Sequence, residues 1–198
     1  MADSLKNYDP DDDVDKPSWL KIRAREGFRY KDYLKLGDDS RVEIVDGMVY
    51  MMAGATIWHQ NMVGKLFLQL GLFFQGKTCK PYVAPFDVRL FPQDDLCDTN
   101  VVQPDLLVVC DKTKIHHNGI FGVPDLIIEI MSNSSEGHDR ITKKKLYERA
   151  GVREYWIVAE KQIYRYHLLD GKYIENEYDY SAGFKLNSCI FPDCVLEF

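Results

Sequence analysis

The feature that most constrains this 198-residue chain is a glutamate inside an otherwise apolar segment. Glu129 lies in the sequence PDLIIEIM (124–131), where apolar residues occupy both alternating sets of positions. This pattern predicts a β-strand that is buried on both faces. A buried carboxylate is costly unless it is paired, hydrogen-bonded or bound to a metal. The segment therefore predicts either an ion pair or a metal ligand at Glu129, with the metal ligand favoured.

A second carboxylate occupies a similar place in the sequence VVQPDLLVV (101–109), where Asp105 follows Pro104. Proline cannot donate to a sheet ladder, so Pro104 marks an edge, a strand start or a bulge. If this strand lies beside the strand of Glu129, the two carboxylates come together. Two hard oxygen ligands suit Mg²⁺ or Mn²⁺. The alternative for Asp105 is a turn-forming or capping role.

A lysine is predicted to approach these carboxylates from the next helix. The sequence HDRITKKKLYERA (138–150), followed by Gly151, predicts a helix with a glycine end. One arc of roughly 100° on its helical wheel holds Asp139, Lys143, Leu146, Tyr147 and Ala150. The apolar residues of this arc must pack inward, so Lys143 carries its charge toward the core, where a carboxylate or phosphate meets it. The alternative is a lysine whose charged end reaches solvent at the edge of the buried stripe.

The remaining pattern predicts a mixed α/β fold rather than a strict βαβ repeat. Residues 1–18 are predicted to form a mobile acidic tail and residues 19–198 a single domain. The expected elements are a short helix (28–36), a hairpin around Asp46-Gly47 (42–52), a long helix (56–75), a strand (83–91), a loop (110–122), a turn (132–137), a hairpin (154–158 and 163–169) and further short C-terminal strands.

Composition limits the class of protein. The net charge of −6 is evidence against tight non-specific DNA binding, which needs lysine and arginine, although it allows a local basic patch. The chain has no signal-peptide pattern at residue 1, and no apolar run approaches the ~18 residues of a membrane span. Five scattered cysteines without a CxxC pair predict reduced, packing thiols. We therefore expect a cytoplasmic protein without membrane contact.

The stretch from Val101 to Ile157 resembles the restriction endonuclease family often called Uma-two, which belongs to the PD-(D/E)XK nuclease superfamily. The resemblance is carried by QPDLLVV, PDLIIEIMSNSS and DRITKKKLYERAGVREYWIV, and upstream by VEIVDGMVYMMAGATIWHQ. It covers roughly residues 28–198. The resemblance implies a restriction-endonuclease-like core, a mixed β-sheet flanked by helices, that hydrolyses DNA with Mg²⁺ or Mn²⁺.

The family pattern implies roles for three of these residues. Asp105 matches the aspartate of the PD motif, and Glu129 matches the acidic residue of the (D/E)XK element, so both would ligate the metal. The usual lysine of that element would fall at Met131, where this sequence departs from the superfamily. In this family the lysine lies on the next helix, at the position of Lys143.

Further positions match the family less specifically. Glu43 matches an acidic position of the N-terminal core and would hold the metal through water or orient the nucleophile, or else it is an exposed strand glutamate. His59 matches a histidine at a helix start, where an accessory role and ordinary capping or packing are equally open. Asp139, on the same face as Lys143, is a further accessory candidate. Asp87 resembles a family position without a defined role.

Two functions of different class remain open. The first is a metal-dependent endonuclease acting on DNA, with Lys143 stabilising charge on the phosphate. The second is a catalytically inactive nuclease fold that binds nucleic acid or protein, which the methionine at position 131 and the net charge keep open. A zinc site built from His116, His117 and His138 is disfavoured, because no ligand spacing supports it.

Assembly is also open at this level. Cleavage of both DNA strands would favour a two-fold homodimer. The aromatic hairpin residues are candidates either for that interface or for the core, and they are Tyr155, Trp156, Tyr164 and Tyr166.

Overall fold

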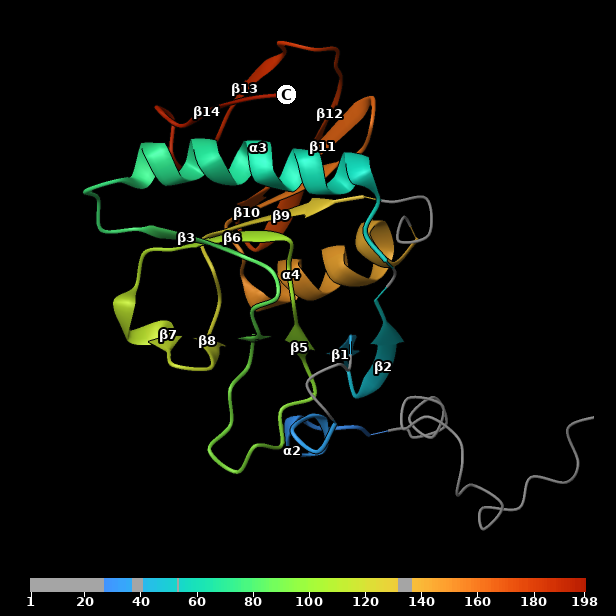
Figure 1. Ribbon diagram of the computed structural model, residues 1–198. Coiled ribbons are helices and arrows are strands. Elements are labelled where there is room, and N and C mark those ends of the chain that lie inside the picture. The colour runs from blue at the N-terminus through green and yellow to red at the C-terminus, as the bar shows by residue number, and fades with distance from the viewer. Residues whose placement is uncertain (1–26, 37–40, 53, 132–136) are drawn as a thin grey trace, which may run out of the picture.

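The computed structural model describes residues 27–36, 41–52, 54–131 and 137–198. Two six-stranded mixed sheets and a two-stranded ribbon form the β-structure, and α3 and α4 lie on either side of the central sheet (Figure 1). The predicted tail (1–18) and most of the predicted turn (132–137) lie outside the described residues. The mixed α/β prediction is confirmed.

The central sheet carries the candidate site. Its strand order is β12-β11-β10-β9-β6-β3, and only β9 and β10 are parallel. The bounds are β3 Lys80–Val83, β6 Leu106–Val109, β9 Leu126–Ile130, β10 Glu154–Val158, β11 Gln162–Leu169 and β12 Lys172–Asp179. The strands of Asp105 and Glu129 are therefore neighbours, as the sequence predicted.

A second sheet packs below the central one with strand order β2-β1-β5-β4-β8-β7. The bounds are β1 Val42–Val45, β2 Met48–Met51, β4 Val88–Arg89, β5 Val101–Val102, β7 Ile115–His116 and β8 Gly119–Phe121. Asp46 and Gly47 both have positive φ, 51° and 76°, which suits the tight turn between β1 and β2. The predicted hairpin is confirmed.

The helices cover opposite faces of the central sheet. Helix α3 (Ile57–Phe74) is capped by Thr56, whose Oγ1 accepts from the backbone N–H of His59 at 3.1 Å. Its buried residues recur every three or four positions and pack on the sheet together with the ribbon of β13 (Lys185–Asn187) and β14 (Val195–Glu197). The other face carries α4 (Lys144–Ala150) and residues of the second sheet.

The helix predicted for residues 138–150 forms in two parts. A π-helical segment, η2 (His138–Lys143), continues directly into α4, which ends at Gly151 with φ 89°. The predicted inward face is confirmed, since Asp139, Lys143, Leu146 and Tyr147 are all buried. Two shorter segments complete the elements: α2 (Tyr30–Tyr33) and the 3₁₀ turn η1 (Lys112–Lys114).

Three element predictions were wrong. The strand expected over 83–91 divides at Pro85 between β3 and β4, and the strand expected over 101–109 divides at Pro104 between β5 and β6. In both places a residue without an N–H interrupts the ladder and the chain passes from one sheet to the other. The expected loop over 110–122 contains η1 and the hairpin of β7 and β8.

The prediction of reduced cysteines was also wrong for one pair. Cys79 and Cys110 form a disulfide between residues 31 apart in sequence. Each adjoins a paired residue of the β3–β6 ladder, Lys80 opposite Val109, so the ladder itself brings the two thiols face to face. A non-local pairing of this kind leaves no spacing signal in the sequence. Among the described helices, none is long and apolar enough to cross a membrane.

Candidate active site

Asp105 lies at the break between β5 and β6, where Pro104 ends one ladder before the other begins. Its Oδ2 accepts a hydrogen bond from the backbone N–H of Ile130 at 2.7 Å, and its Oδ1 lies 3.1 Å from Nε2 of His59. The hydrogen bond that His59 donates to the Asp105 carboxylate raises the pKa of His59. Both side chains keep some exposure, 16% for Asp105 and 14% for His59, so this pair faces solvent at its outer side.

Glu129 lies on β9 and is 4% exposed. Its Oε1 accepts from Nζ of Lys143 at 2.9 Å and from the hydroxyl of Tyr147 at 3.0 Å. Among the described residues, its Oε2 accepts a single hydrogen bond, a long one of 3.3 Å from the backbone N–H of Asp105. Burial raises the pKa of Glu129 well above its usual value, although the neighbouring Lys143 charge opposes that shift.

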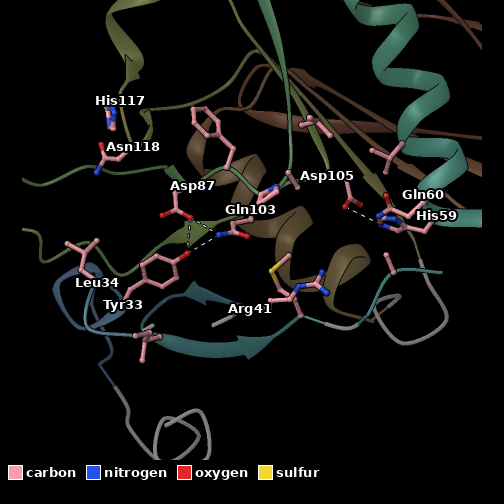
Figure 2. A pocket seen from close by; sticks show the side chains of 18 residues that line it. Tyr33, Leu34, Arg41, His59, Gln60, Asp87, Gln103, Asp105, His117 and Asn118 are labelled. Carbon is pink, nitrogen blue, oxygen red and sulfur yellow. Dashed lines mark hydrogen bonds and ion pairs between the residues drawn. The ribbon is translucent and has the colours of Figure 1, made fainter. Parts of the chain in front are cut away.

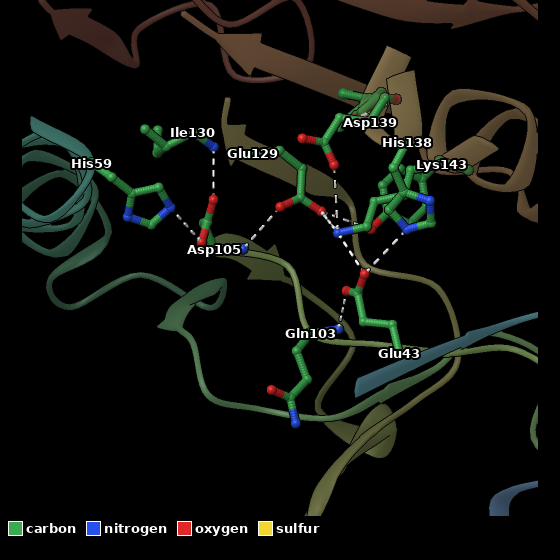
Figure 3. A network of polar contacts seen from close by, with 11 residues as sticks. Glu43, His59, Gln103, Asp105, Glu129, Ile130, His138, Asp139 and Lys143 are labelled. Atoms are coloured by element: carbon green, nitrogen blue, oxygen red, sulfur yellow. Dashed lines mark hydrogen bonds and ion pairs between the residues drawn. The ribbon is translucent and has the colours of Figure 1, made fainter. Parts of the chain in front are cut away.

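Lys143 joins the carboxylates of two different sheets. Its Nζ lies 2.9 Å from Oε2 of Glu43 and 2.9 Å from Oε1 of Glu129, with Asp139 farther away at 3.8 Å (Figure 3). Burial alone would lower the pKa of Lys143, but the Glu129 and Glu43 carboxylates hold it well above its ordinary value. The ammonium group is therefore charged and held between two acids.

Glu43 is buried on β1. Burial would raise its pKa, but Lys143, His138 and the backbone N–H of Gln103 together lower it to about 2. Oε1 accepts from that N–H at 2.8 Å, and Oε2 lies 3.4 Å from Nε2 of His138. Glu43 is therefore the ionised partner of Lys143.

The network carries more acidic than basic groups. Among the residues that the structure describes, four carboxylates, those of Glu43, Asp105, Glu129 and Asp139, meet one lysine and two histidines. Buried acids without full compensation favour protons or a bound cation. Asp105 and Glu129 offer hard oxygen donors from adjacent strands, which fits Mg²⁺ or Mn²⁺ with water completing the coordination. Within the described ranges, no three His, Cys, Asp or Glu side chains are grouped to hold a metal by themselves.

A cleft of about 780 Å³ opens beside this network. Figure 2 shows Asp105 and His59 toward one end of it, and Tyr33, Asp87 and Gln103 toward the other. Glu129 and Lys143 are buried and are not among the residues that line the cleft. Asp105 is therefore the member of the acidic pair that a molecule in the cleft meets first.

The structure brings together the residues singled out from the sequence. Asp105, Glu129, Lys143, Glu43 and Asp139 belong to one network, which His59 joins through Asp105. The expectation of an exposed strand glutamate does not apply to Glu43, which is 3% exposed.

Sequence reasoning missed three contributors to the network. The hydroxyl of Tyr147 contacts Glu129, the ring of His138 contacts Glu43, and the backbone of Gln103 contacts Glu43. The inward position of Tyr147 was a usable signal, since a buried phenol needs a partner. No local signal pointed to Gln103.

Two other candidates have different places. His116 stacks on Phe121 at 4.2 Å between ring centroids, whereas His138 contacts Glu43, so these two of the histidines weighed for a zinc site have different partners. The aromatic hairpin residues are at most 4% exposed and belong to the core, which excludes them as an interface; they are Tyr155, Trp156, Tyr164 and Tyr166.

Comparisons with known proteins show what the chain is similar to. A family model, Uma2, described as "Putative restriction endonuclease", matches residues 30–194. Uncharacterized protein slr1290 of Synechocystis sp. is 26% identical over 165 residues, which span 80% of this chain and 84% of that protein. Uncharacterized protein sll1609 of the same organism is 25% identical over 125 residues, spanning 62% and 68% of the two chains.

A solved structure has a similar fold. It is described as a putative nuclease belonging to DUF820 from Anabaena variabilis, and it matches with a TM-score of 0.66 at 14% identity. The match covers 83% of this chain and 91% of that one. At this identity the likeness establishes a nuclease-like fold.

Proposed function

Since this chain belongs to the Uma2 family of restriction endonuclease-like proteins, we propose that it is a metal-dependent endonuclease that hydrolyses the phosphodiester bonds of DNA. The observation that carries the proposal is the convergence of three residues from separate segments. Asp105 and Glu129 are joined through a backbone hydrogen bond, and Lys143 contacts Glu129 from the following helix. Such a set suits attack of water on a phosphate.

In this proposal Asp105 and Glu129 hold one divalent cation, Mg²⁺ or Mn²⁺. When bound, the cation supplies Lewis-acid stabilisation of the phosphate and activates water. His59 holds the Asp105 carboxylate from the cleft side at 3.1 Å, and the Ile130 N–H holds it from the strand side at 2.7 Å. These two contacts orient the carboxylate without using all of its lone pairs.

Lys143 supplies the positive charge that the superfamily lysine would supply from position 131. Its ammonium group is fixed between Glu129 and Glu43, both at 2.9 Å, so it is preorganised rather than free to rotate. Glu43, itself held by the Gln103 N–H and His138, keeps Lys143 in that place. Asp139 adds a third, more distant acid, which keeps the ammonium group protonated.

DNA is the proposed substrate in spite of the net charge of −6. Arg41 is the one lysine or arginine among the described residues that line the cleft, and it is exposed. It lies close enough to His59 for its charge to oppose the rise in the pKa of that histidine that Asp105 causes. We assign it the phosphate contact next to Asp105. Cleavage of both strands would favour a two-fold homodimer, and we place this activity in the cytoplasm.

The test combines a nuclease assay with calorimetry. Purified protein is incubated with supercoiled, linear and single-stranded DNA in Mg²⁺, Mn²⁺ or EDTA, and Mn²⁺ affinity is measured for wild type and Glu129→Gln. We expect cleavage only with metal and weaker Mn²⁺ binding by the variant. Unchanged Mn²⁺ affinity would reject the metal site. Normal DNA binding without cleavage of any form would instead support the inactive binding module.

A further inference from the structure

The end of the cleft away from Asp105 contains a second polar cluster that the hydrolytic proposal does not use. Oδ1 of Asp87 accepts from the Tyr33 hydroxyl at 2.9 Å and from Nε2 of Gln103 at 2.8 Å. Nε2 of Gln103 also donates to the Tyr33 hydroxyl at 2.9 Å (Figure 2). Three side chains from α2, the β4 edge and the β5–β6 break thus fix one another in the wall of the cleft.

This arrangement leaves two acceptor oxygens outside the hydrogen bonds of the cluster, on residues that line the cleft. Both amide hydrogens of Gln103 are used within the cluster, and the Tyr33 proton goes to Asp87. Burial and the Asp87 carboxylate raise the pKa of Tyr33, so the phenol stays a donor. Oδ2 of Asp87 and Oε1 of Gln103 have no hydrogen-bonding partner in the part of the chain that the structure describes. Both atoms can only accept.

A carboxylate in a DNA-binding cleft repels phosphate, so its partner must be a hydrogen-bond donor. The donors that DNA offers are the amino and imino groups of its bases. Aromatic rings stand beside the acceptors: Phe86 lines the cleft and is stacked on Tyr82 with centroids 5.1 Å apart, and Tyr33 is stacked on Tyr30 at 5.8 Å. Rings in such positions support unstacked bases.

We propose that the Tyr33–Asp87–Gln103 cluster is a nucleobase subsite that selects an unpaired base carrying an exocyclic amino group, through Oδ2 of Asp87. The inference rests on the proposed function and adds a specificity determinant to it. The subsite is also linked to the hydrolytic network, since the backbone N–H of Gln103 donates to Glu43, the partner of Lys143. A base bound here would therefore fix the position of the phosphate near Asp105.

The test uses binding without cleavage. Fluorescently labelled hexanucleotides of deoxycytidine and of thymidine are titrated in EDTA, because both are pyrimidines and only cytosine carries the amino group. For wild type we expect about tenfold tighter binding of the deoxycytidine hexamer, the discrimination of one good side-chain–base pair. In Asp87→Asn, Oδ1 can keep both of its donors while Nδ2 turns a donor toward the cleft. The preference should then disappear or reverse toward thymidine, whose O4 accepts.

Two further variants separate recognition from structure. Phe86→Leu should weaken both hexamers roughly tenfold without changing their ratio. Asp179→Asn makes the same change in charge at an exposed position on β12, the opposite edge of the central sheet, and should change neither affinity nor ratio. Equal affinity of wild type for both hexamers would overturn the inference, as would an Asp87→Asn protein with unchanged preference. Neither result would bear on the proposal of metal-dependent cleavage. Conversely, selective binding by a protein that cleaves no DNA would reject only the hydrolytic proposal.

Discussion

Two buried glutamates lie on the adjacent parallel strands β9 and β10, and their surroundings differ in kind. Glu129 is 4% exposed and Glu154 is fully buried. Glu154 accepts from four neutral donors: the indole N–H of Trp156 (2.7 Å), the hydroxyl of Ser188 (2.5 Å) and the backbone N–H groups of Cys189 (2.9 Å) and Ile190 (3.2 Å). Glu129 instead shares one lysine with another acid and has a weakly bonded oxygen beside Asp105.

Both glutamates bear the free-energy cost of burying a carboxylate, but only one of them has surroundings suited to a functional site. The donors around Glu154 satisfy its oxygens and tie the segment before β14 to the central sheet, which is a structural task. The groups around Glu129 leave an excess of negative charge next to a cleft, which is the condition for binding a cation or a phosphate with its metal. Burial makes both carboxylates energetically costly, so burial alone does not separate their roles. Their hydrogen-bonding and ionic partners do.

Removing the lysine should produce the largest effect, because Glu129 depends on a charge and Glu154 does not. Lys143→Met leaves Glu43 and Glu129 buried without their cation, which should cost about 3–5 kcal/mol of unfolding free energy and abolish cleavage. Urea unfolding at neutral pH measures the loss of stability, and the nuclease assay measures the loss of cleavage. Lys145→Met, at an exposed position two residues on, is the matched control and should change little. A loss below about 1 kcal/mol for Lys143→Met would contradict the ion-pair description.

Glu129→Gln should separate activity from stability. The glutamine oxygen can keep the hydrogen bonds from Lys143 and Tyr147, and the Glu43 carboxylate still neutralises Lys143 at 2.9 Å. The lost charge and the lost long bond from the Asp105 N–H should therefore change the unfolding free energy by only about 1 kcal/mol. Cleavage should fall by about 10²–10³-fold, the size of losing one preorganised charge-stabilising group. Rates are compared per folded molecule at saturating metal. An active variant would remove Glu129 from the site.

Glu154→Gln should show the opposite behaviour. In either orientation of the amide, at least one backbone N–H among its present donors faces another N–H and loses its acceptor. The expected loss is about 2 kcal/mol of unfolding free energy, with the cleavage rate of the folded fraction unchanged. If this variant instead cleaved slowly while unfolding normally, the division between a structural and a functional glutamate would fail.

Much of this site could be predicted from the sequence, because misplaced charge is a local signal. Glu129 stands out among isoleucines, and Lys143 stands out on an inward helical face. Glu43 and His59 needed the family resemblance. Glu154 was missed because it stands at the polar start of the EYWIV strand, where a solvated strand end is the ordinary expectation, and its donors come from residues 188–190.

The fold divides in the same way. Helix α3, the β1–β2 hairpin and the β10–β11 hairpin were predicted, since periodicity and turn residues act over short distances. The passage of the chain between the two sheets at Pro85 and Pro104 was not, nor was the bond between Cys79 and Cys110. Each of these depends on which strand lies alongside, and that is decided by packing between distant segments rather than by local pattern.

The smallest effects should come from removing one of the hydroxyl groups that donate to each glutamate. Tyr147→Phe deletes the 3.0 Å bond to Glu129, and Ser188→Ala deletes the 2.5 Å bond to Glu154. Tyr147→Phe should lower the unfolding free energy by about 1 kcal/mol, since it removes one buried hydrogen bond. Ser188→Ala should lower it by about 2 kcal/mol, because Oγ of Ser188 also accepts from the backbone N–H of Phe191 at 3.0 Å and two hydrogen bonds are lost. Only Tyr147→Phe should also slow cleavage, by a few-fold, because Glu129 is then held by Lys143 and the Asp105 N–H alone. Cleavage rates are compared per folded molecule, so the larger stability loss of Ser188→Ala does not enter the comparison. Equal slowing in both would mean that the two glutamates act through the stability of the sheet, and that the partners of Glu129 have no separate catalytic task.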